Sequence, residues 1–527
     1  MNFYASPPEC FGSGQSKLSS DPESSGRSWW LLLVGLVAVA VCLPFFQTIW
    51  SLEDEGVLIH GAERMLRGNK LYADFFEFLP PGGFVLTAGW FSITGMSVWS
   101  ARSLAVLTIV GIACFMYLAC RQASKNAPLS ALLAVGWLIM SQGLWTQLSH
   151  HWFTTLFSMI ATWAAVTNTG QERRWPLISG LAAGAAAMVV PTRGALVMLA
   201  GITALLNPGR RGAEFAVYVI ASAVVPVGLL VFLAWNHALT AAIDDVIRFA
   251  ATRYAPIQVV PFGSWANMQN YPFLYVFPLT VVLTLVICAR DWRTCLHDRP
   301  LRPCIGFCIA GLLGCFPRPD ISHIAFAVPL SCPLLAWCIT RLVQGWRPAW
   351  RFGAAMWLIG LCGPTVLAYA WLADRALRTD TTTGPRGDVA FIQQPGASEM
   401  LARIVALPSG ETVFFYPVMP LLPFLAAREH ISKYDIFTPG FTLPSQYQDA
   451  CQSVMRTASW VVIDRNWTDP NMLSRAFPAM RDPQPRETKA FEEDLDRSFD
   501  FVAREGTFEL RHRVEGTGVS ICSGIDG

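Results

Sequence analysis

Acidic side chains crowd residues 51–82, which directly follow the first long apolar segment of the chain. The carboxylates of this stretch belong to Glu53, Asp54, Glu55, Glu63, Asp74 and Glu77. Only 14% of all residues are charged, and charged groups beside a bilayer are costly unless they face water or a site. A carboxylate placed there can act as a general base toward a hydroxyl group. Charge density alone also fits a solvated loop between two spans.

A second set of ionisable side chains falls at the ends of later apolar segments. Its members are His150, His151, Arg193, Asp244, Asp245, Arg248, Arg253, Arg318, Asp320 and His323. Arginine suits a phosphate because its planar fork can bind two oxygens, and histidine can bind a phosphate or carry a proton. Turns, interfacial positions and local ion pairs are the alternative roles, and Asp244 and Asp245 fit a solvated loop. A carboxylate base beside a cationic phosphate site predicts transfer from a lipid phosphate.

The elements that hold these residues are membrane helices. The 527-residue chain is 53% hydrophobic, and its 14% charged residues compare with about 25% in soluble proteins. We therefore expect a polytopic α-helical membrane protein with about 11–13 transmembrane helices. The net charge of +2 gives no reason to expect nucleic acid as a partner.

Basic residues sort the ends of these helices by side. Lys17 and Arg27 precede the first span, which predicts a cytoplasmic N-terminus in an inner (plasma) membrane protein. The ends near 146–151, 191–193, 236–270 and 316–323 then face outward together with the first loop. Residues 84–96 are apolar but too short for a straight span, so we expect an interfacial or re-entrant segment.

Three domains follow from composition. Residues 1–28 are rich in Ser, Gly and Pro and predict a disordered cytoplasmic tail. Residues 29–373 form the transmembrane domain with its first outer loop at 50–82, and residues 374–527 predict a small extracytoplasmic α/β domain. Strand-like runs occur at 412–416, 460–464 and 507–510. Cys451 and Cys522 can pair if this region is extracytoplasmic, and Glu63 is expected on the solvated face of an amphipathic helix in the first loop.

The order of motifs resembles the GT-C superfamily of membrane glycosyltransferases, and in particular bacterial members of the protein O-mannosyltransferase and aminoarabinose transferase group. The matching residues are Asp54, Glu55, Gly56, Gly68, Leu71, Tyr72, Asp74 and Pro80 to Gly82, followed by Arg318 to His323. Residues 180–196 fit a helix pair in the middle of those proteins, and the resemblance covers roughly residues 30–370. His150 and His151 stand where some members have an acidic residue.

The resemblance implies a polyprenyl-phosphate sugar as donor and a hydroxyl of a glycan, lipid or protein as acceptor. It places Asp54 as the catalytic base, with Glu55 beside it. The implied substrate-binding residues are Asp74, His151, Arg193, Arg318, Asp320 and His323. Most members that use a monophosphate donor work without a metal, and the acidic loop leaves a divalent metal ion open. The alternatives are a transporter or flippase of a lipid-linked saccharide, and a polysaccharide polymerase or ligase of the outer leaflet.

Overall fold

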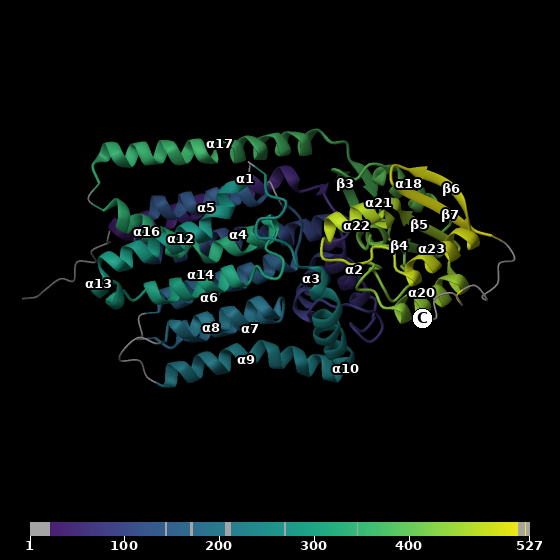
Figure 1. Ribbon diagram of the computed structural model, residues 1–527, viewed down its shortest axis with the longest axis horizontal. Helices are drawn as coiled ribbons and strands as arrows, with labels where there is room; N and C mark the ends of the chain where they lie inside the picture. The colour runs from purple at the N-terminus through teal and green to yellow at the C-terminus, as the bar shows by residue number, and fades with distance from the viewer. Residues whose placement is uncertain are drawn as a thin grey trace, which may run out of the picture.

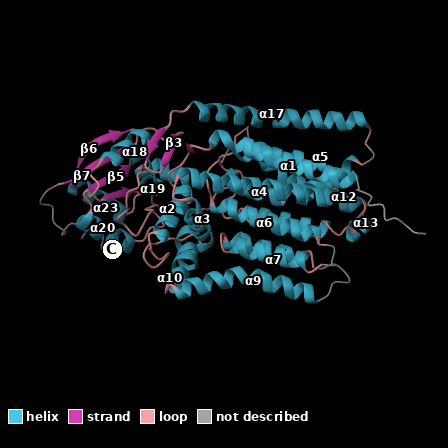
Figure 2. Cartoon of the chain, turned by 180° about the vertical axis from the view of Figure 1, so that it is seen from behind, coloured by secondary structure: helices cyan, strands magenta, loops and turns pink. Residues whose placement is uncertain are grey.

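A computed structural model describes residues 22–142, 145–168, 172–205, 212–267, 270–344, 346–514 and 522. Long helices run side by side through most of the molecule, and a domain that contains the sheets caps one end of them (Figure 1). The view from behind shows the strands gathered at that same end (Figure 2). The polytopic helical architecture with a small mixed C-terminal domain is therefore confirmed.

The helical body consists of elements that are mostly apolar along their whole length. They are α1 (Pro22–Cys42), α4 (Val98–Ser124), α5 (Ala127–Gln142), α6 (His150–Thr167), α7 (Arg174–Ala187), α8 (Pro191–Thr203), α9 (Gly212–Trp235), α12 (Tyr271–Arg290), α14 (Leu301–Leu313), α16 (Cys332–Val343) and α17 (Pro348–Arg378). Within the described residues, α4, α9 and α12 are long and apolar enough to cross a membrane by length and composition alone. A fourth crossing is possible if the bent pair Ile321–Leu330 and Cys332–Val343 forms one span. The number of about 11–13 crossings stays a prediction.

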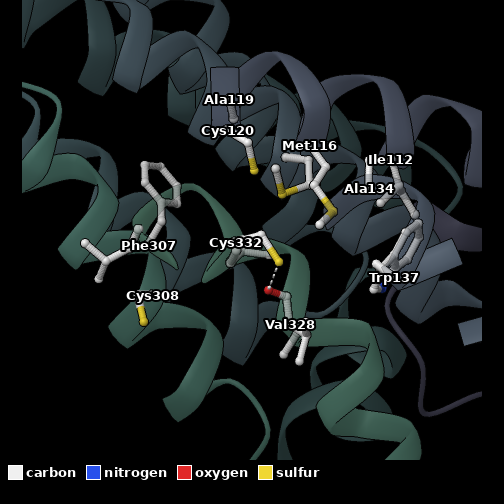
Figure 3. Packing of buried hydrophobic residues seen from close by; sticks show 14 of the residues in the cluster. Ile112, Met116, Ala119, Cys120, Ala134, Trp137, Phe307, Cys308, Val328 and Cys332 are labelled. Atoms are coloured by element: carbon white, nitrogen blue, oxygen red, sulfur yellow. Dashed lines mark hydrogen bonds between the residues drawn. The ribbon is translucent and has the colours of Figure 1, made fainter. Parts of the chain in front are cut away.

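Small side chains let these helices approach closely. A Cβ atom on Gly184 of α7 would lie 2.3 Å from the carbonyl oxygen of Ser222 in α9, so these two helices pack nearly backbone to backbone. Elsewhere the core alternates small and large groups, as Figure 3 shows around Met116, Trp137 and Cys332. The Cys332 thiol donates to the carbonyl oxygen of Val328 at 3.4 Å. The buried cysteines of this core, such as Cys120 and Cys332, act as small apolar residues.

The first loop and the short apolar segment that follows it form two short helices. Helix α2 (Asp54–Leu66) matches the amphipathic helix expected from the spacing of its apolar residues. Helix α3 (Pro81–Thr94) starts with proline at its first turn, where a missing backbone N–H costs nothing. With 14 residues, α3 spans about 21 Å, which is short of a bilayer core of about 30 Å. A Cβ on Gly56 would lie 2.2 Å from the backbone nitrogen of Leu421, so α2 rests directly on α19 (Leu421–Leu425) of the C-terminal domain.

Two sheets build the C-terminal domain. In the larger one the strand order is β4 (Val413–Tyr416), β5 (Trp460–Asp464), β7 (Phe508–Arg513) and β6 (Phe499–Glu505), with β4 and β5 parallel and the other pairs antiparallel. The three strand-like runs of the sequence are thus strands. Its helices are α18 (Ala397–Ala406), α20 (Pro444–Thr457), α21 (Arg465–Thr468), α22 (Pro470–Ala476) and α23 (Arg486–Ser498). A disulfide joins Cys451 and Cys522, the pairing that the sequence left open.

The smaller sheet ties the first loop to this domain. Its order is β1 (Thr48–Ile49), β3 (Gly387–Phe391) and β2 (Thr382–Gly384), and β1 pairs in parallel with β3. The backbone N–H of Ala390 donates to the carbonyl oxygen of Gln47 at 2.8 Å. The chain that enters the first loop is therefore an edge strand of the C-terminal domain.

Two expectations differ from the structure. Helix α1 begins at Pro22, inside the segment expected to be an unstructured tail, because the apolar helix extends over about two more polar turns; residues 1–21 lie outside the described residues. The expectation that Glu63 is solvated is wrong. Its side chain is buried and pairs with Arg67 at 2.9 Å and with Arg386, because the C-terminal domain covers the face of α2 that would otherwise meet water.

Candidate active site

Asp54 opens helix α2 and presents an exposed carboxylate. The N-terminus of a helix favours a negative charge through its free backbone N–H groups and its dipole. The carboxylate reaches solvent but has protein on most sides, and this burial raises the pKa of Asp54. The charges of His323 and Arg318 act in the opposite direction, and the charge of Asp320 raises the pKa further. The carboxylate of Asp54 thus interacts electrostatically with the motif from Arg318 to His323.

The Arg318 to His323 motif forms the cap of helix α15 (Ile321–Ala327). One Asp320 oxygen accepts from the backbone N–H of His323 at 2.9 Å and lies 2.8 Å from its Nδ1, and the other accepts from Nε of Arg318 at 3.0 Å. Burial raises the pKa of Asp320, but its bonds to His323 and the charges of His323 and Arg318 bring it below the usual value. Asp320 therefore holds the side chains of Arg318 and His323 in place.

Nitrogen-rich side chains, one buried and two half-buried, lie next to this motif. The ring of His151 is 4.7 Å from that of His323 and 4.0 Å from that of His150, between centroids. Arg193 is 1% exposed and donates to the carbonyl oxygen of Gly314 through Nε and Nη2, each at 3.4 Å. Among the described residues, Nη1 of Arg193 and Nδ1 of both His150 and His151 have no hydrogen-bond partner. Unpaired buried polar groups are costly and call for a ligand or water, and these suit an anion.

Glu55 occupies a different environment from its neighbour. Its side chain is fully buried, where it pairs with Arg102 and accepts from the backbone N–H of Leu148 at 2.9 Å. Successive residues of a helix point about 100° apart, so Asp54 faces the open side while Glu55 faces the core. The role of Glu55 in the catalytic pair stays a prediction, and the structure pairs its carboxylate with Arg102.

Asp74 makes its hydrogen bonds within the turn that follows α2. Its exposed carboxylate accepts from the backbone N–H of Lys70 at 2.7 Å, and its own N–H donates to the Lys70 carbonyl oxygen at 2.8 Å. These two bonds close a turn between α2 and α3. In the described parts of the chain, no hydrogen bond or ion pair joins Asp74 to the residues gathered around Asp54.

Two further residues reach the site. Nε1 of Trp467, in the C-terminal α21, and the hydroxyl of Ser51 both donate to the carboxylate of Glu53. Burial raises the pKa of Glu53 to about 7, against the hydrogen bond from Ser51, and the charge of Asp54 adds to the rise. The density of acids in the first loop pointed to this stretch as a whole. No local signal could select Trp467, because it lies 414 positions further along the chain.

One group of potential metal ligands occurs in the described residues of the C-terminal domain. There, the side chains of Cys451, Asp494 and Cys522 form a group close enough to share an ion. The two cysteines are joined in a disulfide, so their sulfurs are not available as thiolate ligands. The carboxylates of the first loop do not form such a group in this part of the chain.

Comparisons with known proteins locate the fold. No family model matches the chain, and no curated protein matches its sequence. A structure of ArnT from Cupriavidus metallidurans bound to undecaprenyl phosphate aligns with a TM-score of 0.55 and 13% identity, over 93% of this chain and 99% of that one. ArnT in the apo state gives 0.53 at 13% identity, over 93% and 98% of the two chains. The arabinofuranosyltransferase AftD from Mycobacteria gives 0.52 at 13% identity, over 94% of this chain and 40% of that one.

These likenesses span the helical body and the C-terminal domain together, since each covers more than nine tenths of this chain. At 13% identity these alignments show the fold but do not identify the substrate. The chain therefore shares the fold of ArnT and AftD, which is the GT-C fold expected from the order of its motifs.

Proposed function

We propose that this protein is an integral membrane glycosyltransferase that moves a sugar from a polyprenyl-phosphate donor to an acceptor hydroxyl outside the cytoplasm. One observation carries the proposal. The open carboxylate of Asp54 at the start of α2 lies within electrostatic range of Arg318 and His323, and behind them Arg193 and His151 hold buried polar atoms without partners in the described residues. A base beside an anion site is the arrangement that this transfer requires.

In this reaction Asp54 and the cationic residues have separate roles. Asp54 takes the proton of the acceptor hydroxyl, whose oxygen forms a bond to the anomeric carbon of the donor sugar. The bond between that carbon and the phosphate oxygen breaks, and polyprenyl phosphate leaves with the electron pair. Arg318, His323 and Arg193 stabilise the charge that develops on the phosphate, because groups fixed in a water-poor site need no reorganisation during the reaction. His151 can add a hydrogen bond to the phosphate through its ring.

The class of lipid is supported by a neighbour of the same fold. ArnT from Cupriavidus metallidurans is bound to undecaprenyl phosphate in its structure, and its alignment includes nearly all of this chain. The acceptor belongs to one of three classes, a cell-envelope glycan, a glycolipid or a protein. The location in the inner membrane and the outward orientation of Asp54 rest on the distribution of basic residues.

The test is transfer of a radiolabelled sugar from polyprenyl phosphate to endogenous acceptors in membrane vesicles. We expect Asp54→Asn to lower the transfer rate by about 10²–10⁴-fold, the range typical of a lost general base. Asp244→Asn is the matched control, because Asp244 is an exposed carboxylate paired only with Arg248 in the described residues. A folded Asp54→Asn protein with the full rate would refute the assignment.

The same vesicles separate an enzyme from a transporter. An enzyme joins the label to an acceptor and releases the lipid phosphate, whereas a flippase only moves the intact donor between leaflets. Label that crosses the membrane and stays on the lipid would favour the transporter. Transfer from a diphosphate-linked chain, but not from a monophosphate-linked sugar, would favour the polymerase or ligase.

A further inference from the structure

One short stretch of the C-terminal domain, residues 465–477, contacts the candidate site on both of its sides. At its start, Trp467 donates its indole N–H to Glu53, the residue before Asp54. At its end, the carbonyl oxygen of Ala476 accepts from Arg318 at 3.0 Å, and the ring of Phe477 lies 5.4 Å from the Arg318 guanidinium. Both sides of the site, the acidic loop and the cationic motif, are therefore contacted by the same segment.

This stretch is held firmly enough to position a side chain. Its two helices, α21 and α22, each begin with an aspartate cap. Asp464 accepts from the backbone N–H of Asn466 at 3.0 Å, and Asp469 accepts from that of Asn471 at 2.9 Å. The indole of Trp467 packs on an aromatic cluster that joins both domains. The cluster contains Phe78 from the first loop, Phe249 and Tyr254 from the π-helix Asp244–Tyr254, and Phe441 from the C-terminal domain.

We propose that Trp467 is a positioning residue for the proposed transfer reaction, which holds Glu53 beside Asp54 through its indole N–H, so that the C-terminal domain completes the catalytic loop. This inference rests on the glycosyltransferase function proposed above. Trp467 acts through Glu53 and not on the substrate. Two donors, Trp467 and Ser51, converge on the same carboxylate, which fixes its orientation next to the base.

Ionisation of Glu53 has a direct consequence for Asp54. A negative charge on Glu53 opposes a second negative charge on Asp54 and makes Asp54 a stronger proton acceptor. The pKa of Glu53 is raised to about 7, by burial first, so this ionisation falls near neutral pH. We therefore expect the transfer rate to rise with pH through a midpoint near 7. The other titratable or charged groups that face the pair are Arg318, Asp320 and His323 on the cationic motif and the neutral phenol of Tyr254 on the π-helix.

Loss of the indole donor has a defined sign. A hydrogen bond to a carboxylate favours its charged form, so Trp467→Phe raises the pKa of Glu53 while leaving an aromatic ring of similar shape. The acid limb of the rate profile then moves to higher pH by roughly 0.5–1 pH unit. The rate is reduced at neutral pH and returns toward that of the unmodified protein once the medium is alkaline enough to ionise Glu53. A purely structural defect would lower the rate equally at every pH.

Trp460→Phe is the matched control. Trp460 lies in β5 of the same domain, and its Nε1 has no hydrogen-bond partner in the described part of the chain. Its replacement removes an indole of the same size without touching a carboxylate, so the rate profile should stay in place. A Trp467→Phe profile that coincides with that of the unmodified protein, or one lowered uniformly over the whole range, would overturn the inference.

A measurement without substrate separates this inference from the proposed reaction. The full-length protein in detergent is titrated by infrared spectroscopy, and the carboxyl band of Glu53 is identified by its loss in Glu53→Gln. We expect that band to titrate near pH 7 in the unmodified protein, at higher pH in Trp467→Phe and unchanged in Trp460→Phe. If the Glu53 band shifts in Trp467→Phe but no sugar is transferred, the proposed reaction is refuted and the contact between Trp467 and Glu53 stands. If sugar is transferred but the band does not shift in Trp467→Phe, only the contact is refuted.

Discussion

The buried pair of Glu55 and Arg102 allows a sharp test of how the first loop is held. Both side chains are nearly inaccessible, at 0% and 2% exposure. Arg102 also donates to the carbonyl oxygen of Thr48 at 2.6 Å, at the strand that joins the loop to the C-terminal domain. Arg102→Met removes the cation and keeps most of the volume, so the Glu55 carboxylate is left buried without its counter-ion.

The cost follows from desolvation. Removal of one partner from a buried ion pair typically destabilises a protein by about 3–5 kcal/mol. At about 1.4 kcal/mol for each factor of ten, this is between about two and four orders of magnitude in the ratio of folded to unfolded protein. Replacement of both residues by apolar ones should recover most of the loss, because no buried charge remains. Oε2 of Glu55 and Nε of Arg102 have no partner in the described residues, which favours recovery.

Equilibrium unfolding in mixed detergent micelles measures these differences. The control is Arg248→Gln, which breaks an exposed pair with Asp244 whose side chains are 76% and 46% accessible; we expect a change of at most about 0.5 kcal/mol. The reasoning fails if Arg102→Met costs no more than this control. It also fails if Arg102→Met combined with Glu55→Leu is as unstable as Arg102→Met alone.

Two further predictions concern the C-terminal domain. The disulfide between Cys451 and Cys522 closes a separation of 71 residues, so Cys451→Ser with Cys522→Ser should cost about 4 kcal/mol by the chain-entropy relation; unfolding with and without a reducing agent checks this, and a reductant that lowers the stability of the double variant as much as that of the unmodified protein would contradict it. Asp435, bound to His60 at 2.7 Å and to Arg64 at 3.3 Å, has a pKa well below its usual range, because these partners outweigh the opposing effect of burial. A depressed folded pKa means that its contribution to stability is complete above the unfolded pKa of about 4 and is lost as the pH falls further; Asp435→Asn should therefore show a flatter loss of stability in acid, and an unchanged slope would contradict the assignment.

Much of the site was accessible from the sequence because its parts are local. Asp54 follows an apolar span and opens a helix whose spacing is visible in the chain. Arg318, Asp320 and His323 lie within six positions and bond to one another. The strand at 460–464 has the same bounds in the structure as in the sequence pattern. Each of these features depends on neighbours in the chain, which periodicity and capping rules describe well.

The sequence by itself determined that this is a helical membrane protein, that its acidic first loop is the place to look for a base, and that Asp54 and the Arg318 to His323 motif are candidates. Only the tertiary structure decided which carboxylates remain free. The carboxylates of Glu55 and Glu63 form ion pairs with Arg102 and Arg386, and the carboxylate of Glu53 accepts a hydrogen bond from Trp467. The physical reason is that the chemistry of a carboxylate depends on its burial and its charged partners, and here those partners come from segments 47 to 414 positions away.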